Sequence, residues 1–213
     1  MRRYTAGFMM LTGLLTIWTL SGCVETVDTP VSAPPPAAVS QGRSGTLSVA
    51  DFAQVVSRVE PVAERECRAR TTGANCDFKI VVETDPSAPA NAWQMLDKSG
   101  RPVLTFTVAL IRDVQNTDEL AFILGHEAAH HVAGHIERTQ QTAMTGALLG
   151  GVLVAAMGGD ANAVSSAQDL GATVGARTYS KNYELEADQL GTVIAYRAGY
   201  NPVRGAAYFT RIA

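Results

Sequence analysis

Residues 117–135 read TDELAFILGHEAAHHVAGH, and this stretch holds all four histidines of the chain. It contains the string HExxH, in which His126 and His130 are four positions apart and Glu127 follows the first histidine. Residues four apart lie on one face of a helix, so both imidazoles can reach one metal ion while Glu127 reaches a water molecule beside it. The pattern predicts a zinc-dependent hydrolase with His126 and His130 as ligands and Glu127 as the catalytic group. The alternative is an exposed polar helix, and the apolar character of residues 118–124 counts against it.

A catalytic zinc site takes three protein ligands and leaves a fourth position open, so one more ligand is needed. The metzincin spacing fails, because its glycine and third histidine positions hold Ala133 and Ile136. The gluzincin arrangement takes a glutamate from a later helix, and residues 183–188 read YELEAD. Glu184 and Asp188 share one helical face, so we predict Glu184 as the third ligand and Asp188 as the carboxylate that bonds a ligating imidazole. Glu186 lies nearly on the opposite side of that helix and is the poorer ligand.

The string HExxHxxxxH ending at His135, the ExxAD of residues 184–188 and the AGYNP of residues 198–202 together resemble one family. It is the family of zinc endopeptidases that includes the CAAX prenyl endopeptidase, the heat-shock membrane protease HtpX and small lipoprotein members, which this chain is most similar to. The resemblance covers about residues 48–213. It implies a mainly helical α+β, zincin-like fold with a small antiparallel sheet or hairpin, one zinc ion and polypeptide substrates. It also implies that residues 103–108 form an edge strand that pairs with an extended substrate.

The N-terminal sequence indicates where the protein is located in the cell. Arg2 and Arg3 precede an apolar stretch over residues 8–20, and Leu20-Ser21-Gly22-Cys23 resembles a bacterial lipobox. We predict a lipoprotein signal peptide at residues 1–22, with lipidation of Cys23, including palmitate; a plain secretory signal is the alternative. Residues 23–45 are predicted to be a flexible tether and residues 46–213 the metallopeptidase domain. The protein would then be anchored by lipid in the bacterial cell envelope, facing the periplasm, with the outer membrane favoured over the inner.

The charge and the cysteines limit the partners further. The net charge of −3 becomes −5 without residues 1–22, which contain two arginines and no acid, and this mild acidity indicates no nucleic-acid surface. Besides Cys23 the chain has Cys67 and Cys76. In an oxidising compartment we expect a disulfide between them, worth about 2 to 3 kcal/mol; two unpaired buried thiols are the alternative.

Apolar periodicity predicts a helix over residues 47–67, which Pro61 would kink or end. A strand is expected at residues 78–83, and residues 93–96 and 103–111 are expected to form a hairpin. The zinc helix should run from Thr117, which with Asp118 would cap it, to about residue 134. Residues 141–159 carry no charge and include the GxxxG of Gly146 and Gly150. We expect a helical hairpin or lid there with its turn at residues 158–162; a transmembrane span is the alternative.

The predicted function is peptide hydrolysis in the bacterial cell envelope, as protein quality control acting on polypeptides such as misfolded envelope proteins. The candidates for stabilising the oxyanion are Tyr179, Tyr183, Tyr196 and Arg197. One alternative is a chaperone-like or assembly-factor lipoprotein with a mainly structural metal site. Another is a scaffold that associates through residues 144–157. An open fourth position beside Glu127 favours catalysis, because a structural site would close it with a protein ligand.

Overall fold

The computed structural model describes residues 47–177 and 180–212. These residues are mainly helical and include one three-stranded sheet, which confirms the predicted α+β class. The predicted signal peptide (residues 1–22), the lipidation site Cys23 and the tether (residues 23–45) lie outside the described residues, as does Tyr179.

Helix α1 spans Val49–Arg70 and begins with a capping box, in which the Ser48 hydroxyl accepts from the Asp51 N–H and the Asp51 carboxylate accepts from the Ser48 N–H. Pro61 lies inside α1 and does not end it. Its cost of one backbone hydrogen bond is offset by burial of the face that carries Val55 and Val59. At the C-terminal end of α1, Cys67 is joined to Cys76 by a disulfide, with a Cα–Cα distance of 5.7 Å.

The sheet consists of β1 (Lys79–Glu83), β2 (Ala92–Leu96) and β3 (Pro102–Thr107) in the order β1-β3-β2. Strands β2 and β3 form the expected antiparallel hairpin, whereas β1 pairs with β3 in parallel. The expectation that residues 103–108 form an edge strand is wrong. Strand β3 is central and buried along its whole length, because β1 covers its second side. The edge that remains beside the predicted zinc helix is that of β2.

The chain turns from β3 directly into the short helix α2 (Val108–Asp113), so the predicted strand is shorter than residues 103–111. The Thr107 hydroxyl accepts a hydrogen bond from the Leu110 N–H and caps this helix.

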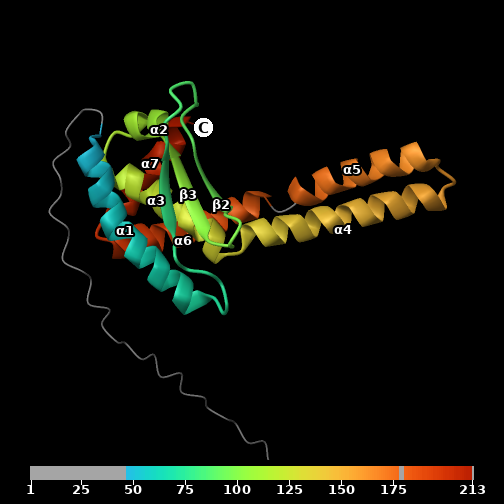
Figure 1. Ribbon diagram of the computed structural model, residues 1–213, viewed down its shortest axis with the longest axis horizontal. Coiled ribbons are helices and arrows are strands. Elements are labelled where there is room, and N and C mark those ends of the chain that lie inside the picture. Colours follow the sequence, from blue (N-terminus) through green and yellow to red (C-terminus); the bar gives the residue numbers. More distant parts are fainter. Residues whose placement is uncertain (1–46, 178–179, 213) are drawn as a thin grey trace, which may run out of the picture. The chain divides into compact units, whose positions relative to one another are not determined.

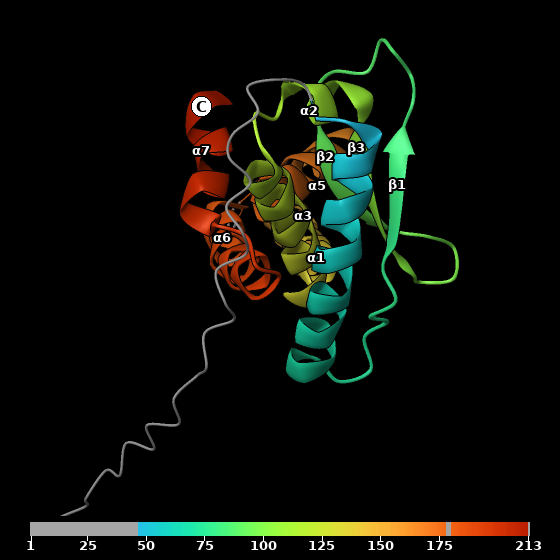
Figure 2. The same cartoon turned by 90° about the vertical axis from the view of Figure 1, so that its left-hand side faces the viewer.

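Helix α3 (Thr117–Val132) lies at the centre of the described fold. Its N-cap is Asn116, not Thr117, because the Asn116 side chain accepts from the N–H groups of Asp118 and Glu119. Figure 2 shows α3 between α1 and the sheet on one side and α6 (Ser180–Arg197) and α7 (Pro202–Ile212) on the other. The two strings that the sequence singled out therefore lie on neighbouring helices, α3 and α6.

Helices α4 (His135–Ala156) and α5 (Ala161–Arg177) form an antiparallel hairpin, as expected from the segment 141–159 with a turn at residues 158–162 (Figure 1). The turn contains Gly158, whose φ of 81° lies in the left-handed region that favours glycine. Among residues 47–177 and 180–212, no helix combines the length and the hydropathy that a membrane span requires.

Candidate metal centre

The three predicted ligands meet at one point. His126 and His130 lie one turn apart on α3, and their Nε2 atoms are 3.0 Å apart. From α6, Glu184 places Oε2 at 3.3 Å from His126 Nε2 and Oε1 at 3.7 Å from His130 Nε2. One ligand atom from each residue lies within 4.8 Å of the others. The structure thus assembles two imidazoles and one carboxylate from two helices.

Two glycines allow this convergence. A Cβ atom on Gly191 of α6 would lie 2.9 Å from the backbone nitrogen of His126, and one on Gly125 would lie 2.9 Å from the carbonyl oxygen of Gly191. Both distances are shorter than real Cβ contacts, so the two helices approach as closely as they do because neither residue has a side chain. The close contact that brings Glu184 to the histidines therefore lies between Gly191 and Gly125, the residue directly before His126.

Asp188 lies where the sequence suggested. Its Oδ1 is 3.0 Å from Nδ1 of His126. A carboxylate accepts the Nδ1–H, so this contact selects the tautomer whose Nε2 lone pair faces His130 and Glu184.

The second histidine is held differently. Nδ1 of His130 is 2.8 Å from Nδ1 of His135, and Nε2 of His135 is 3.2 Å from a Glu186 oxygen. The same Glu186 oxygen accepts from the Arg138 guanidinium at 2.8 Å. The turn between α3 and α4 makes this contact, because Gly134 adopts φ 65° and directs the chain so that α4 begins at His135. Reasoning from the sequence missed this role for both His135 and Glu186, although a fourth histidine directly after a glycine was the available signal.

The electrostatics of the site follow from its burial and its carboxylates. Burial opposes protonation of His126, but Glu184, Glu127 and Asp188 together outweigh it and raise the pKa of that imidazole. The neighbouring imidazoles of His126 and His130 hold the pKa of Glu184 far below its usual range, so Glu184 is ionised. Burial raises the pKa of Glu127 in spite of the two neighbouring imidazoles. Burial also lowers the pKa of His135, which favours its neutral form.

The donor set fits a zinc ion. With their Nδ1 atoms engaged, His126 and His130 direct two Nε2 lone pairs at each other and at an ionised carboxylate. Three acceptors that face one another across about one ion's width repel each other unless a cation lies between them. Two imidazoles and one carboxylate are a usual catalytic zinc set, and the side chain of Glu184 is 58% exposed, which leaves the site open on one side.

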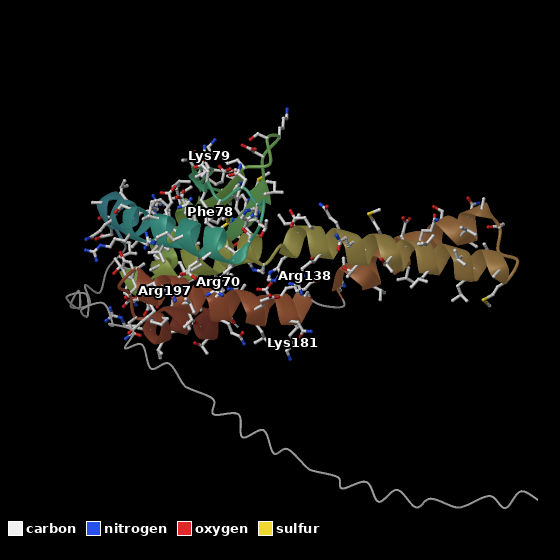
Figure 3. The ribbon with its side chains drawn as sticks, turned by 90° about the horizontal axis from the view of Figure 1, so that it is seen from below. Arg70, Phe78, Lys79, Arg138, Lys181 and Arg197 are labelled. Carbon is white, nitrogen blue, oxygen red and sulfur yellow. A yellow bond between two sulfur atoms is a disulfide. The ribbon has the colours of Figure 1, made fainter. Side chains whose placement is uncertain are left out.

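A cavity of about 700 Å³ opens over these residues. Its walls come from the edge strand β2, from the start of α4, from α6 and from α7. The lining residues include Trp93, Gln94, Glu127, Ile136, Tyr183 and Tyr208. Among the described residues, the one buried side-chain polar atom without a hydrogen-bond partner is Nε2 of Gln94. Of the candidates for stabilising the oxyanion, Tyr183 lines this cavity. Arg197, which is labelled in Figure 3, instead forms an ion pair with Glu66.

Residues 50–209 match the sequence model of peptidase family M48. The chain belongs to peptidase family M48. Members of this family are zinc-dependent metallopeptidases, in keeping with the His-His-Glu group of the structure.

Two relatives of this M48 chain are named as proteases. A beta-barrel assembly-enhancing protease of Vibrio cholerae is 31% identical over 111 residues, which are 49% of this chain and 23% of the relative. The mitochondrial metalloendopeptidase OMA1 of Saccharomyces cerevisiae is 31% identical over 136 residues, which are 64% of this chain and 37% of the relative. The match thus covers well under half of either relative's length.

Proposed function

We propose that this M48 protein is a zinc endopeptidase of the bacterial cell envelope that cleaves polypeptides as part of protein quality control. The observation that carries the proposal is the meeting of His126, His130 and Glu184 next to Glu127 at the wall of a large cavity. The name of the Vibrio cholerae relative supports an envelope setting. The lipobox-like sequence ending at Cys23 supports anchoring by lipid, and Val24 in place of an aspartate after it, by resemblance to enterobacterial lipoproteins, favours the outer membrane.

In this proposal His126, His130 and Glu184 hold the zinc ion, and Asp188 orients His126. When bound there, zinc supplies positive charge that activates a water molecule and polarises the scissile carbonyl. Glu127 accepts the proton of the attacking water and passes it to the leaving amine. Its raised pKa suits both steps, because a carboxylate with higher proton affinity is a stronger base and is still able to release the proton to an amine.

We place the substrate along β2. This strand pairs with β3 on one side only, and its residues Ala92, Trp93 and Gln94 line the same cavity as Glu127. An extended peptide added to this edge satisfies its backbone with little regard to side chains, which suits a protease that acts on misfolded proteins. Nε2 of Gln94 is a buried donor without a partner, and a substrate carbonyl oxygen is the acceptor that we assign to it.

The test compares three variants in casein cleavage and zinc content. Glu127→Gln should keep zinc and lose cleavage, His130→Ala should lose both, and Glu137→Gln, an exposed glutamate on α4, should keep both. Full cleavage by Glu127→Gln would refute the peptidase assignment. If Glu127→Gln still prevented aggregation of an unfolded client as well as wild type, a chaperone-like activity would exist beside or instead of proteolysis.

The proposed lipid anchor at Cys23 is tested separately. Cells labelled with radioactive palmitate should incorporate label into the wild-type chain and none into Cys23→Ser. Equal incorporation by both chains would place the acyl group elsewhere.

A further inference from the structure

The α4–α5 hairpin has its small residues inside and its large apolar residues outside. A Cβ atom on Gly146 would lie 2.0 Å from the carbonyl oxygen of Gly171, and one on Gly175 would lie 2.1 Å from that of Thr142. The two backbones are therefore in direct contact along two GxxxG stripes, Gly146 with Gly150 and Gly171 with Gly175. Helices in membranes commonly pack through small residues at this spacing. Lipid tails are as apolar as leucine side chains, so close van der Waals contact, and not the burial of large apolar residues, holds such helices together.

The large apolar side chains of the hairpin point away from this contact. Between 58% and 65% of the surface of each is exposed for Leu148, Leu149, Val152, Leu153, Leu170 and Val174. Several of them line an apolar groove of about 870 Å³ between the two helices. A hairpin stable in water buries such residues between its helices, so the arrangement is the reverse of that expected for an aqueous surface.

Charges are nearly absent from this surface. Helix α4 has no charged residue after Arg138, and Asp169 is the one charge of α5 before Arg177. Figure 3 shows Arg138 and Lys181 at the base of the hairpin. The exposed apolar residues lie on both helices, with Leu149 and Leu153 on α4 and Leu170 and Val174 on α5, so the apolar surface is not confined to one helix. Lipid can cover the apolar side chains of both helices at once.

We propose that the α4–α5 hairpin is a lipid-contacting element, which buries its outer apolar side chains in the apolar layer of a bilayer. Residues at the base of the hairpin, Ile136, Thr139 and Ala176, line the cavity that contains Glu127. The contact would therefore hold the cavity at the membrane surface. The contact stands on the hairpin itself and does not depend on the proposed peptidase activity.

The test places an environment-sensitive fluorophore on the hairpin of the full chain. NBD is attached to a cysteine at Leu153 in one chain and to a cysteine at Ser165, which is exposed and outside the groove, in a matched chain. The parent chain without a new cysteine gives the background labelling. Vesicles of phosphatidylethanolamine and phosphatidylglycerol should shift the emission at position 153 to the blue, and doxyl-labelled lipid should quench it. The probe at position 165 should change much less.

Two results would overturn the proposal. Equal responses at positions 153 and 165 would show that the apolar face does not enter lipid. Shielding of the probe at position 153 without vesicles, in a dimer seen by ultracentrifugation, would make a second copy of the chain the occupant. In a further variant, Leu149→Gln with Leu170→Gln should raise the lipid concentration at half-maximal change by roughly ten-fold or more. Folding of each variant is checked by its thermal unfolding, which does not depend on peptidase activity.

A second and independent observation concerns His135. If Nε2 of His130 is to be free for a metal ion, the contacts around His135 leave one proton assignment: His130 donates Nδ1–H to Nδ1 of His135, and His135 donates Nε2–H to Glu186. In the reverse assignment, His130 would carry its proton on Nε2, where the metal binds, and a neutral His135 would turn a lone pair toward a carboxylate. The ring of His135 is also fixed, because it stacks on Tyr183 with centroids 4.5 Å apart and planes at 14°.

We infer that His135 and Glu186 are positioning residues for zinc binding, which hold His130 in its metal-binding tautomer as Asp188 holds His126. Arg138 completes the group, since it bonds Glu186 and lies over the Tyr183 ring at 4.4 Å. This inference rests on the proposed zinc site but not on catalysis.

The test measures the zinc dissociation constant against a chelator and the visible spectrum of the cobalt-substituted protein. His135→Leu removes the acceptor and should weaken zinc binding roughly 10- to 100-fold. His135→Asn places an amide oxygen near the position of Nδ1 and should restore most of the affinity. Equal zinc affinity and cobalt spectra for wild type and His135→Leu would overturn the inference. Equal loss in both variants with unchanged thermal unfolding would do so too, because it would show that the acceptor is not what matters.

Discussion

The closest approach of α3 and α6 makes a single methyl group a strong test of the site. In Gly191→Ala the new Cβ would meet the His126 backbone nitrogen at 2.9 Å and its Cα at 3.0 Å. Carbon contacts are optimal at roughly 3.5 to 4.0 Å, so α6 must move away from α3 by about 0.5 to 1 Å. Backbone atoms cannot turn aside as a side chain would, and Glu184 and Asp188 lie on the same face of α6 as Gly191.

The expected effect on the site is larger than the effect on stability. Overpacking costs about 1 to 3 kcal/mol, whereas alanine gains about 1 kcal/mol over glycine in a helix, so we expect a net loss of at most about 2 kcal/mol. A displacement near 1 Å of the Glu184 carboxylate from the histidines should lower kcat/KM about 100-fold and weaken zinc binding by a similar factor.

The assay pairs Gly191→Ala with Thr192→Ala, its exposed neighbour on the same helix. Zinc affinity by chelator competition, kcat/KM on a peptide and urea unfolding are measured for both. Thr192→Ala should match wild type in all three. If Gly191→Ala kept the zinc affinity and kcat/KM of its control, the view that helix spacing sets the site would be wrong.

Four further outcomes are expected. Replacing both Cys67 and Cys76 by alanine opens a loop with a sequence separation of 9 and should lower the free energy of unfolding by about 2.5 kcal/mol, as urea titration would show. Arg211→Met leaves the buried carboxylate of Glu119 without its guanidinium and should cost about 3 kcal/mol in the same assay, against little change for the exposed Arg65→Met. Removal of metal with a chelator should lower the melting temperature, and added zinc should restore it, because the ion binds the folded chain in preference to the unfolded one. Gln94→Leu should raise KM for an extended peptide and leave zinc content unchanged; an unaltered KM would remove Gln94 from the substrate site.

The elements with strong local signals were predicted well. The helices that carry HExxH and ExxAD, the hairpin of β2 and β3 and the turn after Gly158 all follow from short-range periodicity or turn residues. The errors at the N-cap of α3 and at the end of β3 are local, whereas the error about the edge strand concerns long-range pairing. Nothing near residues 103–108 indicates that β1, more than 20 residues earlier, adds in parallel and makes β3 the central strand.

The sequence by itself determined which side chains can bind a metal, because His126 and His130 share a helical face whatever surrounds them, and the spacing of Glu184 and Asp188 obeys the same rule. Only the tertiary structure decided how those faces meet. The contact between Gly125 and Gly191, the return of His135 onto His130 at the Gly134 turn and the open edge of β2 each join residues that are distant in the chain or depend on a backbone turn. Helical spacing is a local property of the backbone, whereas the approach of two helices depends on every side chain between them.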